Sequence, residues 1–344
     1  MKVKQKPSLQ ELNTFGVPAK AKLLFEIENE EDVLQLLQFD RSHDFVLGGG
    51  SNVLFVNDVP GMVYLNRITG IDVIEEDSEH ALIEAGAGEI WHELVTWSLG
   101  RGLSGLENMA LIPGLAGAAP IQNIGAYGAE LSSVLDSVTA WDWQAAKWVV
   151  IGNADCSFGY RDSRFKSAEP GRYFITSIRL RLRKHFVAQL SYPGLRGALD
   201  AAGISEPSAA DVCAAVIRLR REKLPDPALQ GNAGSFFKNP VVAADRLEEL
   251  RTAFPKLPVW PLDDRHAKIS AAWMIEQCGL KGLQMDGAAV SERHALVLIN
   301  LGNATGHAIW QLALHVQREV QQKFGIALEP EPEIYTGPIP NATA

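Results

Sequence analysis

Residues 113–128 read PGLAGAAPIQNIGAYG, an apolar segment that four glycines and two prolines interrupt. Glycine and proline both disfavour the interior of helices and strands, so this segment is expected to form neither. Its backbone N–H and C=O groups still need hydrogen-bond partners once the segment is buried. A long flat ligand that carries ring nitrogens, carbonyls and a pyrophosphate would supply such partners. An irregular loop buried against the rest of the protein is the alternative.

The chain contains no stretch suited to crossing a membrane. Its most apolar run, MALIPGLAGAAPI, is short and is broken by Pro113 and Pro120, whereas a span needs about 20 apolar residues. The N-terminal MKVKQKPSLQELNTF is basic, but no apolar region follows it, so it is not a secretory signal. Cys156, Cys213 and Cys278 lie far apart without a CxxC or zinc spacing, which is typical of reduced thiols in a cytosol. We therefore expect a cytoplasmic protein with no metal site and no membrane contact.

The charge balance bears on the kind of ligand. A formal net charge of -9 and a pI near 5.4 argue against a nucleic-acid-binding protein, which usually carries a basic surface. A local group of basic side chains can still serve one anionic small molecule. Its members are Arg218, Arg220, Arg221 and Lys223.

The length predicts more than one domain. A chain of 344 residues is too long for one ordinary core and suits two or three domains. We expect boundaries that divide the chain into residues 1–66, 67–218 and 219–344, with the proline-rich KLPDP segment next to the last boundary. Strands and helices are mixed without strict βαβ alternation, which favours an α+β fold over a doubly wound sheet.

Hydrophobic periodicity predicts several elements. Residues 176–183 alternate between apolar and polar side chains, as a strand with one wet face does, and residues 138–151 indicate a hairpin. Residues 89–99 indicate a helix that buries Ile90 among other apolar side chains. A longer apolar stripe near the C-terminus predicts a helix that ends at Gly325, because glycine is common just after a helix.

A second glycine-rich segment lies between two apolar runs. Gly48, Gly49 and Gly50 are followed by Ser51 and Asn52. Three glycines let backbone N–H groups crowd around an anion, and the two polar side chains add hydrogen bonds. No Gly-Lys-Ser/Thr follows, so the segment is not a P-loop, and no helix follows, so it is not the dinucleotide fingerprint. A tight turn that binds nothing is the alternative.

Arg161 stands in the segment FGYRDSRFK, beside an aromatic residue and a carboxylate. A guanidinium is planar and can bind a carboxylate through two parallel hydrogen bonds. Arg161 is therefore a candidate for holding an acidic group of a substrate. An internal salt bridge between Arg161 and Asp162 is the alternative.

Ser235 stands in the segment GNAGSFFKNP, between a flexible turn and two aromatic residues. Such a hydroxyl can point into a pocket that holds little water. No Gly-x-Ser-x-Gly elbow surrounds it, so it is not a hydrolase nucleophile, and donating a proton to a carbanion is a better use of it. A serine with a structural role is the alternative.

The segment LEPEPE at residues 328–333 alternates carboxylates with prolines, which restrict the backbone and thereby fix where each carboxylate points. An inward glutamate here can act as an acid or polarise a reacting group. A solvated acidic tail is the alternative.

Taken in order, several segments resemble the UDP-N-acetylenolpyruvoylglucosamine reductase family. They are NTFGV, GGGSNVLF, GLENMALIPG, PIQNIGAYG, FGYRDS, KLPDP, NAGSFFKNP, HALVLIN and LEPE, and they extend from Asn13 to Glu331. The resemblance implies an α+β architecture. Two subdomains of the vanillyl-alcohol-oxidase type would clasp FAD, and a smaller α+β domain would bind the substrate.

The resemblance also implies a reaction. NADPH would reduce FAD and leave, and UDP-N-acetylglucosamine enolpyruvate would then enter and be reduced to UDP-N-acetylmuramate for peptidoglycan synthesis. The methylene carbon of the enolpyruvyl group would take up hydride, and the neighbouring carbon would take up a proton. Hydride addition makes an enolate-like anion, which fixed donors stabilise. We expect the enzyme to act as a monomer.

Carried over residue by residue, the resemblance assigns roles to three groups. Ser235 matches the proton donor, and Arg161 and Glu331 match the pair that holds and polarises the substrate carboxylate. Cofactor contacts fall on Gly48, Gly49, Gly50, Ser51, Asn52, Pro113, Gly114, Gly117, Gln122, Asn123, Gly125, Ala126, Tyr127 and Gly128. Substrate contacts fall on Tyr160, Tyr192, Lys223, Asn239 and His294.

One feature places this chain in a class of the family, and another departs from the family pattern. Tyr192 resembles the tyrosine on the extra loop of the longer class of the family, which closes over the UDP diphosphate. After LEPE the family commonly continues with Val-Arg, whereas Pro332 and Glu333 follow here. Two other functions stay open on the residues alone: an FAD oxidase of another alcohol or carbohydrate, and a nucleotide-sugar-binding protein without catalysis.

Overall fold

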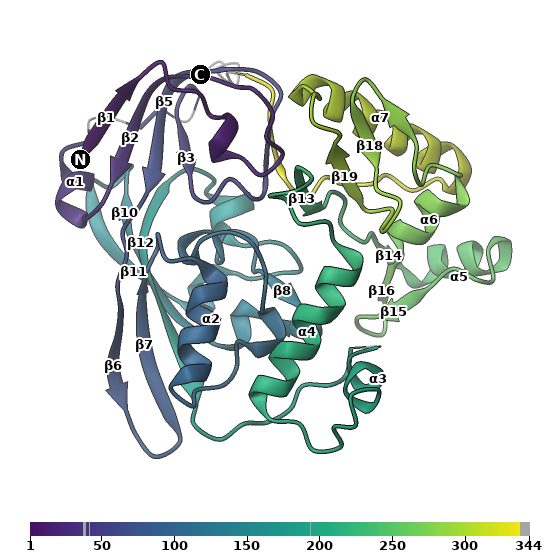
Figure 1. Cartoon of the computed structure of the whole chain (residues 1–344), viewed down its shortest axis with the longest axis horizontal. Coiled ribbons are helices and arrows are strands. Elements are labelled where there is room, and N and C mark those ends of the chain that lie inside the picture. The colour runs from purple at the N-terminus through teal and green to yellow at the C-terminus, as the bar shows by residue number, and fades with distance from the viewer. Residues whose placement is uncertain (37–38, 41, 193, 338–344) are drawn as a thin grey trace.

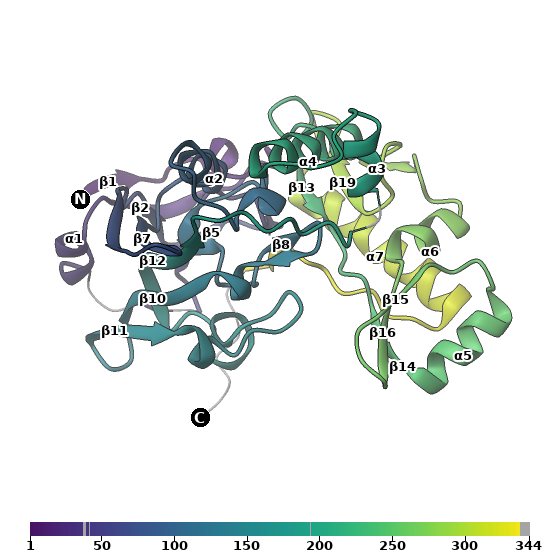
Figure 2. The same ribbon diagram turned by 90° about the horizontal axis from the view of Figure 1, so that it is seen from below.

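The computed structural model describes residues 1–36, 39–40, 42–192 and 194–337. Two sheets lie on one side of the molecule, and the chain that follows helix α4 forms a lobe on the other side (Figures 1 and 2). Most strand pairs are antiparallel, and helices occur in all parts of the described chain. The predicted α+β class is confirmed.

The N-terminal sheet has the strand order β1-β2-β5-β3. Its strands are β1 (Lys2–Gln5), β2 (Ala21–Ile27), β5 (Val59–Asn66) and β3 (Phe45–Leu47). The pairings β2–β5 and β5–β3 are parallel, and β1 runs antiparallel to β2. The short helix α1 (Glu30–Leu34) follows β2 and is capped by the side chain of Asn29.

The second sheet is antiparallel throughout and has the order β11-β10-β12-β7-β6. Its strands are β11 (Lys147–Gly152), β10 (Leu135–Asp142), β12 (Tyr173–Arg183), β7 (His80–Gly86) and β6 (Ile71–Glu76). The strand predicted at residues 176–183 is confirmed within β12, and β10 and β11 confirm the predicted hairpin. In β12, Ile178, Leu180 and Leu182 are buried while Arg181 and Arg183 are exposed, as the alternation indicated.

Three helices accompany this sheet: α2 (Trp91–Gly100), α3 (Leu195–Asp200) and α4 (Ala209–Lys223). Helix α2 confirms the helix predicted at residues 89–99, but the predicted burial of Ile90 is wrong, because Ile90 precedes the first turn and is 47% exposed. Helix α4 begins with a capping box between Ser208 and Asp211 and ends at Lys223, the first residue of the KLPDP segment.

The remaining lobe contains two small sheets, with orders β13-β19-β18-β17 and β14-β16-β15. Their strands are β13 (Asn232–Ser235), β19 (Val297–Asn300), β18 (Ala288–Val290), β17 (Gln284–Met285), β14 (Val241–Ala243), β16 (His266–Ile269) and β15 (Val259–Pro261). The helices of the lobe are α5 (Ala244–Ala253), α6 (Ala271–Gln277) and α7 (Gly306–Phe324). Helix α7 ends at Gly325 in the left-handed conformation, as predicted.

The chain returns to its N-terminal part at the end. Strand β20 (Glu333–Tyr335) pairs in parallel with β4 (Val53–Phe55). Strand β4 directly follows the glycine-rich segment 48–52. One hydrophobic core contains apolar residues from both the N-terminal sheet and the final lobe, including Leu54, Phe236 and Ile309. A second core belongs to the five-stranded sheet and helices α2 to α4. The N-terminal sheet and the final lobe therefore pack against each other through one shared core.

Within the described ranges, no helix is both long and apolar enough to span a bilayer. The same part of the chain holds no group of three or more His, Cys, Asp or Glu side chains arranged to bind a metal ion.

Candidate active site

Arg161 and Glu331 form an ion pair between distant segments. Nε of Arg161 lies 3.0 Å from Oε1 of Glu331, and both side chains are largely buried. A second nitrogen of Arg161, Nη2, donates to the carbonyl oxygen of Gly125 at 2.6 Å. A guanidinium carries five N–H groups, so donors remain for a ligand carboxylate. Asp162 instead accepts from the backbone N–H of Ser163, so the structure pairs Arg161 with Glu331 rather than with its neighbour.

The backbone holds Arg161 in an unusual conformation. Its φ of +55° lies in the left-handed region, inside a tight turn in which Gly159 and Asp162 exchange backbone hydrogen bonds. A residue with a side chain rarely adopts this conformation unless its surroundings enforce it, and such residues cluster at functional sites. The turn directs Arg161 toward the segment 113–128, where it donates to the carbonyl of Gly125.

The C-terminal segment that carries Glu331 is fixed on two sides. On one side the N–H of Glu331 donates to the carbonyl of Phe236 at 2.8 Å. On the other side, Asn52 Nδ2 donates to the carbonyl of Glu331 at 3.3 Å and to Oε1 of Gln122 at 2.8 Å. Asn52 thus connects the glycine-rich segment, the segment 113–128 and the catalytic candidate Glu331. The carboxylate of Glu329, by contrast, points outward, being 72% exposed.

Ser235 is the last residue of β13, opposite Val297 of β19. A bulge between Asn232 and Ser235 changes the register, and Gly234 has a φ of +70°. A bulge re-aims the side chains that follow it. Ser235 is partly buried, and the residue after it, Phe236, makes the backbone contact with Glu331. The fold therefore brings the predicted proton donor and the predicted carboxylate pair to one place.

The two glycine-rich segments pack against each other. A Cβ on Gly49 would lie 3.1 Å from Cα of Gly114, and a Cβ on Gly114 would lie 2.8 Å from Oγ of Ser51. Gly50 has a φ of +62°, and a Cβ there would collide with the carbonyl oxygen of Leu12 at 1.9 Å. Glycine at these positions lets the segments approach closely, which other residues would prevent.

The first glycine-rich segment also has free donors. Among the described residues, the backbone N–H groups of Gly49, Gly50 and Ser51 donate to no protein acceptor. Consecutive N–H groups that face one space form a site for an anion such as a diphosphate. This arrangement fits the anion-binding interpretation better than that of a turn that binds nothing.

The segment 113–128 is irregular, as expected. It contains a single 3₁₀ turn at Ala116–Ala118 and the two-residue strand β8 (Gly125–Ala126), which pairs with β9 (Ala129–Glu130). Asn123 and Tyr127 both have positive φ values. The side chain of Asn123 bonds to Glu130, to the carbonyl of Gly159 and to the N–H of Ser132, so its amide braces the loop itself.

A second group of predicted residues gathers around Tyr192. Its ring meets that of Tyr127 edge-on at 4.8 Å, and Nζ of Lys223 lies 5.9 Å from its centre. A Cβ on Gly128 would lie 3.0 Å from Oγ of Ser191, so the loop that carries Ser191 and Tyr192 packs on the segment 113–128. Burial raises the pKa of Tyr127 to about 12, which keeps its hydroxyl protonated. Burial lowers the pKa of the His294 imidazole, and the charge of Lys223 lowers it further.

Tyr160 connects the first group to the final lobe. Its ring lies 5.5 Å from the guanidinium carbon of Arg161 and 4.5 Å from Nζ of Lys268 on β16. Burial raises the pKa of the Tyr160 hydroxyl, to which the backbone of Asn239 also bonds. The side chain of Asn239 accepts a hydrogen bond from the N–H of Ala271 at the start of α6.

Two lysines that the sequence did not indicate as site residues also lie in the site. Lys268 stands over Tyr160, and Lys166 donates to the carbonyl of Glu331 at 3.4 Å. Burial is the largest cause that lowers the pKa of both ammonium groups. Lys166 lies in the FGYRDSRFK segment and could have been selected by that proximity, whereas no local signal marks Lys268.

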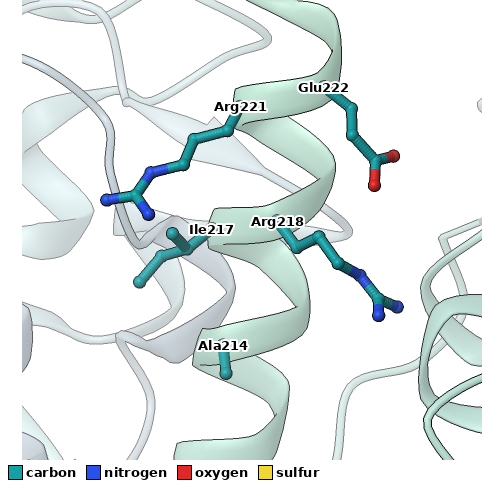
Figure 3. A pocket seen from close by; sticks show the side chains of 5 residues that line it. All are labelled: Ala214, Ile217, Arg218, Arg221 and Glu222. Atoms are coloured by element: carbon teal, nitrogen blue, oxygen red, sulfur yellow. The ribbon is translucent and has the colours of Figure 1, made fainter.

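An open hollow of about 500 Å³ lies beside α4, lined by Ala214, Ile217, Arg218, Arg221 and Glu222 (Figure 3). Its lining comes from one exposed helix face and includes no predicted catalytic or cofactor residue. The hollow therefore does not coincide with the candidate site.

Two half-buried histidines predict a dependence of stability on pH. Burial is the main cause that lowers the pKa of both His92 and His294, and Nδ1 of His294 accepts the N–H of Leu296 at 3.3 Å. Both are neutral in the fold but take up protons near pH 6.5 when unfolded. The contribution of these two histidines to the free energy of unfolding is therefore fully present above pH 6.5, and it is lost as the pH falls through their lowered pKa values in the fold.

We expect His294→Asn, which keeps an acceptor for Leu296, to lose less stability than the unsubstituted protein between pH 7.5 and pH 5. Urea unfolding midpoints at the two pH values measure this difference. His185→Asn makes the same chemical change at an exposed position and serves as the control for the substitution itself. Equal losses in the protein with and without His294→Asn would contradict the prediction.

Comparison with family models finds two matches in the chain. Residues 21–151 match the FAD binding domain, and residues 226–335 match the C-terminal domain of UDP-N-acetylenolpyruvoylglucosamine reductase. The first match contains both glycine-rich segments, and the second contains Ser235 and Glu331.

Relatives match nearly the whole chain. A UDP-N-acetylenolpyruvoylglucosamine reductase of Pseudomonas aeruginosa is 46% identical over 95% of this chain and 97% of its own length. The enzyme of the same name from Neisseria meningitidis is 44% identical over 96% of each chain. The crystal structure of the Thermus caldophilus reductase is similar with a TM-score of 0.68 and 26% identity, covering 97% of this chain and 99% of its own.

Proposed function

The chain belongs to the UDP-N-acetylenolpyruvoylglucosamine reductase family, and from this membership we propose how its residues divide the work. It is an NADPH-dependent flavoenzyme that reduces UDP-N-acetylglucosamine enolpyruvate to UDP-N-acetylmuramate in peptidoglycan synthesis. Its FAD-binding part has the fold of the vanillyl-alcohol-oxidase type, and an α+β lobe accompanies it. The observation that carries the assignment of residues is the ion pair between Arg161 and Glu331.

FAD fits the two glycine-rich segments. The free N–H groups of Gly49, Gly50 and Ser51 suit its diphosphate, and the segment from Gln122 to Gly128 supplies backbone groups beside it. The other proposed contacts are Gly48, Asn52, Pro113, Gly114 and Gly117. When bound, FAD supplies two-electron transfer from NADPH to the enolpyruvyl double bond.

Arg161 and Glu331 act on the substrate carboxylate. Glu331 accepts from Nε and thereby orients the guanidinium, whose remaining donors face the acidic group of the substrate. As negative charge grows on that group during reduction, a preorganised guanidinium in a site with little water stabilises it more than water would. The left-handed backbone at Arg161 supports a role that requires a fixed direction.

Ser235 donates the proton that completes the reduction. Its position after a bulge and beside two buried phenylalanines supports a hydroxyl held in a place of low water content. The carbon next to the carboxylate would receive this proton, and the neighbouring Arg161 would hold that carboxylate in reach.

The group around Tyr192 suits the UDP diphosphate. Lys223 carries a positive charge, His294 is a neutral donor, and Tyr192 sits on a loop that packs on the cofactor segment. Tyr160 and Asn239 extend this surface toward Arg161. We propose that these residues hold the nucleotide part of the substrate, with Tyr192 as the member that closes over it.

The organisation of the chain is part of the same proposal. Residues 1–66 and 67–218 form the two FAD-binding subdomains, and residues 219–344 form the substrate-binding domain. The enzyme acts as a monomer in the cytoplasm.

Anaerobic titration tests this function. The purified protein is expected to be yellow, and NADPH is expected to bleach its flavin absorption, which the enolpyruvyl substrate then restores. A colourless protein that cannot be reconstituted with FAD would remove the cofactor. A flavin that NADPH bleaches but the substrate does not reoxidise would favour a flavoenzyme of another substrate.

A further inference from the structure

Arg220 projects from another face of α4 than the exposed Arg218 and Arg221. Arg218 and Arg221 splay over the hollow in Figure 3, and Arg220 lies about 200° from Arg218 around the helix. Nε of Arg220 is sealed from solvent and has no hydrogen-bond partner within the described part of the chain. Most buried polar atoms in folded proteins have a partner, so this one requires an explanation.

The neighbours of Arg220 belong to the candidate active site. The groups that act on its charge are the Tyr127 hydroxyl, Arg161 and Glu331, and burial is the largest cause that lowers its pKa. The contacts of the same helix agree with this placement, because Nζ of Lys223, one turn further along α4, lies 5.9 Å from the ring centre of Tyr192, and that ring packs on Tyr127. Arg220 thus lies between the cofactor segment and the pair that would hold the substrate carboxylate.

The charges in this place do not balance without a ligand. Glu331 is the carboxylate that acts on Arg220, but its Oε1 already lies 3.0 Å from Arg161. The carboxylate whose charge acts on Arg220 is therefore already paired with Arg161. Arg220 as a whole is half-buried, but burying its Nε–H without a partner is unfavourable, since the lost hydration of that group is not replaced. A ligand that brings negative charge would remove this imbalance.

We propose that Arg220 binds an anionic oxygen of a ligand in the active site through its unpaired Nε. This rests on the proposed function, which supplies two sources of such an oxygen. One is the flavin ring of the cofactor, which gains negative charge on reduction; the other is the carboxylate of the enolpyruvyl substrate. Both would lie between Tyr127 and Arg161.

The first measurement addresses the cofactor. In substrate-free holoenzyme, Arg220→Gln removes the charge and shortens the side chain, which then ends in a neutral amide. If Arg220 binds the reduced flavin, its loss weakens binding of the reduced form about tenfold relative to the oxidised form, which lowers the two-electron midpoint potential by about 30 mV. Redox titration against a reference dye measures this shift, and Arg220→Lys should restore part of it.

The second measurement addresses the substrate carboxylate. The oxidised enzyme is titrated with UDP-N-acetylmuramate, which carries a carboxylate, and with UDP-N-acetylglucosamine, which lacks it. If Arg220 binds that carboxylate, Arg220→Gln weakens the first ligand about tenfold and leaves the second unchanged, as judged from the change in flavin absorption.

A matched control separates this role from loss of charge alone. Arg218→Gln removes a positive charge from the same helix on its exposed face, and it should change neither the potential nor the ratio of the two affinities. A shift in either measurement for Arg220→Gln, and not for Arg218→Gln, supports the proposal and identifies the source. If Arg220→Gln leaves both at the original values, the proposal is overturned. Absence of FAD or of bleaching by NADPH in the unsubstituted protein would instead overturn the proposed function.

Discussion

Replacing Ser235 with alanine is expected to leave the reduction of FAD by NADPH unchanged and to slow the reduction of the substrate by roughly 10²-fold or more, the usual range for a lost general acid. The two half-reactions differ because only the second one places a proton on carbon. Anaerobic stopped-flow traces of flavin bleaching and of flavin recovery measure them separately.

The position of Ser235 makes the substitution a clean one. The serine ends β13 and pairs through its backbone with Val297, so alanine keeps the strand and removes only the hydroxyl. Ser235→Cys restores a donor at the same place and should recover part of the rate. The exposed Ser205 offers a control, because Ser205→Ala should change neither half-reaction. Equal slowing of both half-reactions by Ser235→Ala would remove the assigned role.

Replacing Arg161 with lysine is expected to lower kcat/KM for the substrate by about 10²-fold. Arg161 bonds to Gly125 through Nη2 and contacts Glu331 through Nε, and an ammonium cannot make these contacts while it also holds a carboxylate. Losing one partner of a buried charge pair costs about 2–5 kcal/mol, and each 1.36 kcal/mol is a factor of about ten in rate.

Arg164 provides the matched comparison for Arg161. It stands three residues later and pairs with Glu169 in a separate ionic cluster, so Arg164→Lys should keep near-normal kcat/KM. Steady-state rates over a range of substrate concentrations, together with the rate of flavin bleaching by NADPH, separate substrate handling from cofactor reduction. Near-normal turnover of Arg161→Lys would exclude Arg161 from the site.

Local patterns predicted the regular elements well. The alternation over residues 176–183, the hairpin at 138–151 and the helix that ends at Gly325 are all confirmed. Each depends on the period of apolar side chains or on one residue with an unusual backbone, and both are properties of adjacent residues. Ile90 shows the limit, because it fits the helical pattern but precedes the first turn, where its side chain is exposed.

The candidate site was predicted in a different way. Segments such as GGGSN, FGYRDS and NAGSFF are specific enough to identify the family, and the family supplied the residues. No local pattern could show that Glu331 pairs with Arg161 rather than pointing into solvent like Glu329. The alternative partner, Asp162, was adjacent in sequence, but the left-handed turn at Arg161 directs the guanidinium elsewhere.

By itself the sequence determined the class of fold, the position of the main strands and helices, and the family with its chemistry. Only the tertiary structure decided that β20 pairs with β4, that Asn52 connects three segments, and that Nε of Arg220 is buried without a partner among the described residues. The physical reason is distance along the chain. Periodicity and turn residues record forces between neighbours, whereas these contacts join residues that meet only after two cores have packed, and the shape of that packing sets which charge meets which.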